Sequence, residues 1–258
     1  MKNPLDCIIV NGIDHFPKII SHRGFSDRHI ENTIPALKAA VAAEVEMIEM
    51  DVHETWDGRF IVYHDDRLNH KTPPWNSLTY SQVQSLTSQD ERAPLLSDCL
   101  EVTRSTPVNI ELKRCTSISN LLETLKASSL LKGSFISSSN DNLLLQLHKR
   151  GFQLPLILIV SISKRQTIKQ NLQNAMLCIL PGLLPGFLDG VAVHYPIVRK
   201  TFIQSMQKAG SKVFVWTVDD RENMEKYVSW RVDGIISNYP HRLQDIKRRW
   251  IHIPNKLR

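Results

Sequence analysis

At 258 residues, 42% hydrophobic and 22% charged, the sequence can bury a substantial core and is ordinary for one soluble globular domain. A formal net charge of +6 favours anionic partners in general but carries no information about the fold. Much of this charge lies near the end of the chain, where we interpret it as a solvated helix end rather than a nucleic-acid patch. No apolar run is long enough for a membrane span, and the run that ends at Val10 is too short for a signal peptide.

The four cysteines are widely scattered and have no CxxC spacing. This pattern indicates neither a cysteine zinc site nor a disulfide framework, and it favours a reducing compartment. We therefore expect a cytoplasmic protein. The cysteines are Cys7, Cys99, Cys115 and Cys178.

Short apolar runs alternate with longer helical stretches along the chain. The runs predict strands at Ile19–His22, Met47–Val52, Val108–Lys113, Ser134–Ser138, Leu156–Val160, Gly190–His194, Lys212–Val218 and Gly234–Ser237. Helices are predicted at Asn32–Ala43, Ser117–Ser128, Asp141–Lys149, Pro196–Ala209 and Glu222–Ser229. Eight strands with intervening helices in about 250 residues indicate an α/β protein, a closed parallel TIM (β/α)8 barrel.

Two regions fit the alternation less well. Residues 54–106 are too long for a simple crossover and contain a strand-like segment, Arg59–His64. We predict that they form a small insertion after the second strand, over the barrel mouth, within a single domain of residues 1–258. Residues 161–189 run from a polar helix into PGLLPGFLDG, which we interpret as a packed irregular connection rather than a lid.

Acidic residues lie on one face of two neighbouring predicted strands. Because side chains alternate along a strand, Glu49 and Asp51 share a face, and Glu111 lies on the corresponding face of the next strand. In a barrel we expect these carboxylates to point toward the axis and to meet where active sites are built. Three converging carboxylates need a cation, and oxygen ligands favour Mg²⁺ or Ca²⁺.

Two histidines end strand-like segments in the same part of the chain. His22 is followed by Arg23 and Gly24, and His64 is followed by Asp65. Histidine titrates near neutrality, so this pair suits the acid and base steps of phosphodiester cleavage. His194 is a weaker candidate, and the remaining histidines are interpreted as core or capping residues: His15, His29, His53, His70, His148, His241 and His252.

Further residues suit a phosphate ester. Arg23 and Lys113 are expected to stabilise the growing negative charge on the phosphate. Glu31 and Asn32 either cap the first helix or support the metal ligands, and both interpretations stay open. Trp216 is a candidate aromatic wall near the mouth, although core packing also explains it.

At this point the motifs resemble a known family. HRG and ENT, then EMDVHETWDGRFIVYHDDRL, NIELK, VFVWTVDD and DGIISNYP, resemble the glycerophosphodiester phosphodiesterases from about His22 to Pro240. The resemblance implies a metal-dependent TIM barrel that releases an alcohol and glycerol 3-phosphate from a small glycerophosphodiester. It also implies that a glycerol hydroxyl attacks phosphorus and that water opens the resulting cyclic phosphate.

Carried onto this sequence, the resemblance gives each candidate a role. It implies that Glu49, Asp51 and Glu111 bind one Mg²⁺ or Ca²⁺ and that His22 and His64 are the acid and base. It further implies that Arg23 and Lys113 bind the phosphate while Glu31 and Asn32 support the site. Two alternatives are a phospholipase D-like enzyme that acts on lysophospholipid through a peripheral membrane contact, and a non-catalytic barrel that serves as a binding module. The sequence leaves open the head-group alcohol and the oligomeric state.

Overall fold

The structure is a computed structural model that describes residues 16–88, 93–128, 130–162, 171, 176–177 and 181–251. Its backbone contacts divide the chain into two compact units. One is Ser21–Ile159, and the other joins Met1–Ile20 to Val160–Arg258. Among the described residues, no helix has both the length and the apolar character needed to cross a membrane.

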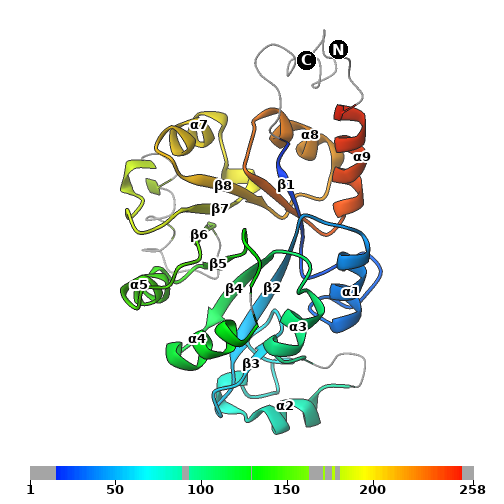
Figure 1. Cartoon of the computed structure of the whole chain (residues 1–258), viewed down its shortest axis with the longest axis vertical. Coiled ribbons are helices and arrows are strands. Elements are labelled where there is room, and N and C mark those ends of the chain that lie inside the picture. The colour runs from blue at the N-terminus through cyan, green and yellow to red at the C-terminus, as the bar shows by residue number, and fades with distance from the viewer. Residues whose placement is uncertain are drawn as a thin grey trace. The chain divides into compact units, whose positions relative to one another are not determined.

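The Ser21–Ile159 unit is built on strands in the order β3-β2-β4-β5-β6 (Figure 1). β2, β4, β5 and β6 are parallel neighbours, and β3 pairs antiparallel with β2. Every residue of β2 is buried, as expected for a parallel strand covered on both faces. The strands are β2 (Met47–Glu54), β3 (Phe60–Val62), β4 (Val108–Arg114), β5 (Phe135–Ser138) and β6 (Leu156–Val160).

Three of the helices described in this unit, α1, α2 and α5, begin at a residue whose side chain caps them. Thr33 accepts a hydrogen bond from the amide of Ala36 at the start of α1, and Pro35 stands in its first turn. Asn140 caps α5 in the same way. The helices are α1 (Ile34–Ala42), α2 (Tyr80–Leu86), α3 (Leu96–Val102), α4 (Ile118–Ala127) and α5 (Asp141–Lys149).

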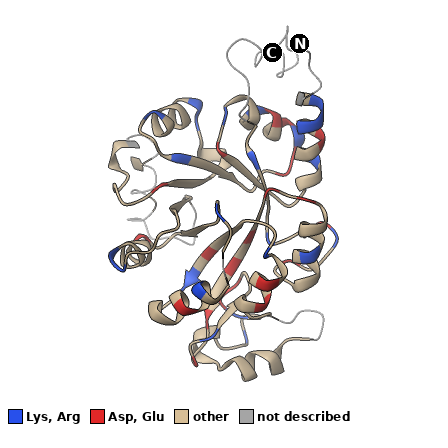
Figure 2. Ribbon diagram, in the orientation of Figure 1, with Lys and Arg blue, Asp and Glu red and all other residues tan. Residues whose placement is uncertain are grey.

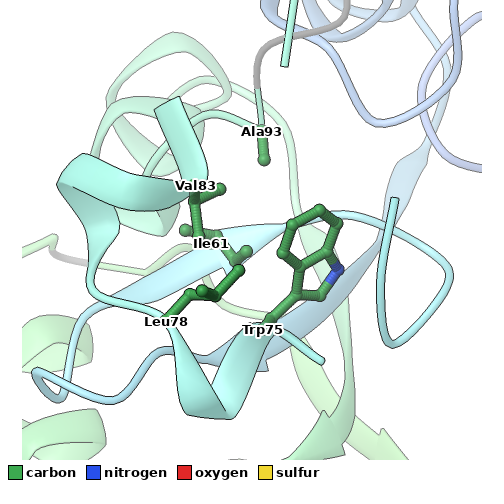
Figure 3. Close-up of a cluster of buried hydrophobic side chains, with 5 residues drawn as sticks. All are labelled: Ile61, Trp75, Leu78, Val83 and Ala93. Carbon is green, nitrogen blue, oxygen red and sulfur yellow. The ribbon is translucent and has the colours of Figure 1, made fainter. Parts of the chain in front are cut away.

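The segment between β2 and β4 has a hydrophobic core of its own. Figure 3 shows its five buried side chains: Ile61, Trp75, Leu78, Val83 and Ala93. They come from β3, the 3₁₀ turn Trp75–Ser77 and the residue after it, α2, and the segment before α3. The predicted strand is present but shorter, as Phe60–Val62. No pattern in the sequence predicts α2 or α3, because a helix of seven residues gives too few repeats for a periodic pattern.

The other unit has strands in the order β1-β9-β8-β7. The predicted Pro196 start of a helix is wrong: Tyr195–Ile197 form a 3₁₀ turn, and extended backbone at Val198 and Arg199 delays the helix to Lys200. The predicted helix within residues 161–189 lies largely outside the described residues. The elements are β1 (Lys18–Ser21), η3 (Pro181–Leu183), β7 (Gly190–His194), η4 (Tyr195–Ile197), α7 (Lys200–Lys208), β8 (Lys212–Trp216), α8 (Arg221–Ser229), β9 (Gly234–Ser237) and α9 (Pro240–Ile251).

The described part of the basic segment near the end of the chain belongs to α9 and carries ion pairs with neighbouring acids. Arg248 contacts Asp245 one turn earlier, and Arg249 lies 3.9 Å from Glu225. These contacts agree with the interpretation of this segment as a solvated helix surface.

The loop after β1 depends on Gly24. Its φ of +81° lies in the left-handed region, and an added Cβ would lie 2.7 Å from the backbone carbon of Ala36. The Gly24 carbonyl accepts a hydrogen bond of 2.7 Å from the Ser21 hydroxyl, and the Phe25 amide donates to the Ala36 carbonyl at 2.9 Å. The glycine therefore lets the loop that carries Arg23 pack directly on α1.

We expect Gly24→Ala to destabilise the protein by about 1–3 kcal/mol more than Gly151→Ala. Gly151 is a matched control because its φ is +72° and nothing lies within 4 Å of an added Cβ. Both variants carry the left-handed strain, but Gly24→Ala alone forces α1 and the loop apart. Chemical denaturation of the two variants measures the difference, and equal free energies of unfolding would contradict this account.

Candidate active site

The three predicted acidic ligands come together on the neighbouring parallel strands β2 and β4. Asp51 and Glu111 are paired in the strand register, and Glu49 lies two residues before Asp51 on β2. One carboxylate oxygen from each of the three lies within 4.8 Å of the others. Figure 2 shows acidic segments on both strands. The prediction that these side chains converge is confirmed.

Asp51 is fully buried and is the most heavily contacted of the three acids. Its Oδ2 accepts a hydrogen bond of 2.8 Å from the Asn32 amide group and lies 3.0 Å from Nε of Arg23. Its backbone N–H donates to Oδ1 of Asn32 at 3.2 Å. Nζ of Lys113 lies 2.9 Å from its other oxygen. Asn32 thus supports an acid directly, in addition to lying next to the helix cap.

Both predicted phosphate-binding cations contact carboxylates in the structure. Lys113 bridges Asp51 and Glu111. Arg23 lies 2.7 Å from Glu31 through a terminal guanidinium nitrogen, and its backbone N–H donates to Oε2 of Glu49 at 2.9 Å. If both histidines were neutral and all three acids ionised, the acids, Arg23 and Lys113 would together carry one net negative charge.

The two predicted histidines lie in the same unit as the acids. Nε2 of His22 is 3.9 Å from Oε2 of Glu49, and Nδ1 of His64 is 3.0 Å from Oδ1 of Asp65. If Nδ1 of His64 carries its hydrogen toward that carboxylate, Nε2 is left with a lone pair. Burial lowers the pKa of His64, which favours the neutral imidazole that a base requires.

The electrostatics of the cluster suit a hard cation. Burial, together with repulsion from Asp51 and Glu111, holds the pKa of Glu49 well above its ordinary value. Burial likewise raises the pKa of Glu111. Burial opposes ionisation of Asp51 as well, but Lys113 and Arg23 hold its pKa well below the usual range. Oε1 of Glu49 is buried without a hydrogen-bond partner, so an oxygen atom is available for a cation.

Trp216 and His194 lie in the other unit, at the ends of β8 and β7. The Trp216 indole N–H donates to the Ala192 carbonyl at 2.9 Å, and its ring centroid lies 5.2 Å from that of His194. These contacts position the indole but do not test its predicted role toward a substrate.

Two buried residues contact the His64 segment in ways that the sequence does not indicate. Nε2 of His53, which we interpreted as a core or capping residue, lies 3.1 Å from the His64 carbonyl oxygen. Trp75 donates its indole N–H to the Asp65 carbonyl at 2.8 Å. The only sequence signal for His53 is its place two residues after Asp51 on the same face of β2. No pattern in the sequence indicates Trp75.

Comparisons with known proteins agree with this geometry. The model of the glycerophosphoryl diester phosphodiesterase family matches residues 22–242. A glycerophosphodiester phosphodiesterase from Caldanaerobacter subterraneus is 27% identical and covers 90% of this chain and 98% of its own length. A human lysophospholipase D is 22% identical, over 88% of this chain and 85% of its own.

A solved structure shows the fold. A phosphodiesterase from Oleispira antarctica, determined in complex with its product sn-glycerol-3-phosphate, has a TM-score of 0.74 at 24% identity. The match covers 90% of this chain and 97% of that one. The fold is the parallel (β/α)8 barrel, so the predicted fold class and the predicted family resemblance are both confirmed.

The raised pKa of Glu49 makes the chelated protein less stable as the pH rises. Between the ordinary carboxyl range and the raised pKa, the folded protein holds a proton that the unfolded chain has released, so each step up in pH favours unfolding. A glutamine side chain is neutral at every pH and has no carboxyl proton to release. We therefore expect Glu49→Gln to raise the free energy of unfolding by about 1–4 kcal/mol in chelator at about pH 8.

Denaturation midpoints from about pH 5 to pH 8 measure this effect. The Glu49→Gln curve should be flatter than that of the parent protein. Glu101→Gln is the control, because that side chain is 71% exposed and should leave the curve unchanged. A lower midpoint for Glu49→Gln at the alkaline end would show that ionised Glu49 stabilises the chelated fold.

Proposed function

We propose, from the premise that the chain belongs to the glycerophosphoryl diester phosphodiesterase family, that it hydrolyses glycerophosphodiesters to an alcohol and glycerol 3-phosphate. The observation that carries the proposal is the meeting of three acids from β2 and β4 within 4.8 Å, in the unit that also holds His22 and His64. The names of the relatives add support, since one is a glycerophosphodiester phosphodiesterase.

Glu49, Asp51 and Glu111 are the residues that would hold one Mg²⁺ or Ca²⁺. They supply only carboxylate oxygens, which both ions prefer, and the buried, unpartnered oxygen of Glu49 fits a ligand atom. Such a dication would offset the negative charge of the acids and polarise the phosphate oxygens. Asn32 would hold Asp51 in place through its two hydrogen bonds.

His22 and His64 would move the protons of the reaction. The attacking hydroxyl must lose a proton and the departing alkoxide must gain one, and an imidazole serves either step near neutral pH. Asp65 would orient His64 through Nδ1, as the 3.0 Å contact indicates. In the proposed route, the first attack comes from a glycerol hydroxyl and the second from water.

Arg23 and Lys113 would stabilise the phosphate in the transition state, where its charge increases. Both are side chains with limited exposure, 16% and 22%, so their attraction to an anion is weakly screened. Glu31 would hold the Arg23 guanidinium in place through its 2.7 Å contact. Trp216 remains our proposal for an aromatic wall beside the substrate.

A second candidate is lysophospholipid cleavage, which the human lysophospholipase D relative favours. The same acids and histidines would serve it, and only the group attached to the phosphate would differ. A cytoplasmic location and a single domain with residues 54–106 over the mouth also remain proposals. The retained set of acids and histidines argues against an idle binding module.

Metal removal and return test the reaction and the substrate together. We expect exhaustive chelation to abolish hydrolysis of a glycerophosphodiester panel and Mg²⁺ or Ca²⁺ to restore it. Release of glycerol 3-phosphate from glycerophosphocholine and of choline from lysophosphatidylcholine, with and without vesicles, separates the two candidates. Full activity after chelation would remove the metal from the proposal, and cleavage of lysophospholipid alone would favour the second candidate.

Substitution tests the roles of the histidines. We expect His22→Ala and His64→Ala each to lower kcat by about 10² to 10⁴-fold while the denaturation midpoint stays near that of the parent protein. His70→Ala is the control, because His70 is exposed and lies in the same β2–β4 segment as His64. Near-normal kcat in either test variant would reject the assigned role.

A further inference from the structure

The segment that carries His64 is held by hydrogen bonds to three of its own consecutive backbone carbonyls. The His64 carbonyl oxygen lies 3.1 Å from Nε2 of His53, and the Asp65 carbonyl accepts the Trp75 indole N–H at 2.8 Å. The Asp66 carbonyl accepts the backbone N–H of Trp75, also at 2.8 Å. Since a carbonyl can only accept, Nε2 of His53 is the atom that carries the hydrogen.

The His53 and Trp75 donors contact the chain just after the end of β3. β3 ends at Val62, and the Tyr63 amide still donates to the Asp51 carbonyl at 3.0 Å. The next three carbonyls receive donors from His53 and Trp75 instead of a strand partner. A segment just past a strand end would otherwise be free to change its backbone angles and to move the imidazole with it.

Both donor side chains are firmly placed. His53 is 5% exposed and lies on β2, on the same face as Asp51 and two residues beyond it. Trp75 is 1% exposed and belongs to the buried cluster of the β2–β4 segment (Figure 3). Its ring also packs edge-on against Tyr63, with centroids 5.2 Å apart. One donor therefore comes from the strand of the acids, and the other from the core of the insertion.

We propose that His53 and Trp75 are positioning residues that fix the backbone of His64–Asp66 and thereby hold the His64 imidazole beside the acid cluster. The insertion then has a role beyond covering the site, because its hydrophobic core supplies the second anchor of an acid–base residue. This inference rests on the proposed role of His64 and extends it to residues that do not touch the substrate.

A kinetic series tests the hydrogen bond from His53. We expect His53→Phe to lower kcat by about 10- to 100-fold with little change in KM, because a misplaced imidazole slows the chemical step. His53→Gln keeps an N–H donor on a side chain of similar length and should recover most of kcat. His53→Phe added to His64→Ala should cause no further loss, since the two act through one imidazole.

Trp75 is tested with the same logic. Trp75→Phe keeps an aromatic ring in the core but removes the indole N–H, and we expect a drop in kcat like that of His53→Phe. Val83→Ala is the matched control: it opens the same core and lowers stability by about 1 to a few kcal/mol, but it leaves all three carbonyl contacts intact and should keep kcat near normal.

An assay without substrate keeps the inference separate from the proposed function. The backbone N–H groups of Tyr63 and Trp75 flank this segment and donate to the Asp51 and Asp66 carbonyls. Their hydrogen exchange should be several-fold faster in His53→Phe and Trp75→Phe than in the parent protein, His53→Gln or Val83→Ala. Unchanged exchange, or equal kcat in the Phe and Gln variants of His53, would overturn the inference. A parent protein with no phosphodiesterase activity would contradict the proposed function. The exchange data would still show whether His53 and Trp75 fix the backbone of His64–Asp66.

Discussion

The structure of the site depends on the burial of one ionised carboxylate, Asp51. A carboxylate removed from water costs several kcal/mol unless charges and hydrogen bonds compensate it. Here the compensation comes from Arg23 and Asn32 in the loop after β1 and from Lys113 on β4. The Asp51 charge therefore ties the loop after β1 to the two strands β2 and β4 of the Ser21–Ile159 unit.

The loop that supplies two of these groups is held in an unfavourable backbone conformation. Arg23 and Asn32 both have positive φ, 57° and 58°, although neither is glycine. Such angles cost about 1–2 kcal/mol per residue and persist only where the surroundings fix them. The backbone N–H of Asn32 donates to the Arg23 carbonyl at 2.9 Å. The side chains of Asn32 and Arg23 both contact the Asp51 carboxylate. The contacts of these two side chains with the Asp51 carboxylate therefore offset the cost of the strained backbone angles at Arg23 and Asn32.

The sequence predicted the acids well because strand alternation is a strong local rule. Glu49, Asp51 and Glu111 were placed on one side by period alone, and their convergence followed from parallel neighbours in a barrel. The contact between His53 and His64 was not predictable. The two residues are eleven apart in sequence, and the register of the short β2–β3 hairpin brings them together. The contact is between a side chain and a backbone carbonyl, so it leaves no pattern in the residue types.

The contacts of Arg23 and Lys113 with the acids also could not be predicted from the sequence. Residue types indicated that Lys113 and Arg23 suit a phosphate, but not that both would already contact acids in the folded chain. The two interpretations are compatible under the proposed function. With a dication among the carboxylates, Asp51 and Glu111 need Lys113 less, and its ammonium can turn toward the phosphate without leaving a buried charge uncompensated. Under that proposal the same ammonium would stabilise the acids before the metal binds and the substrate afterwards.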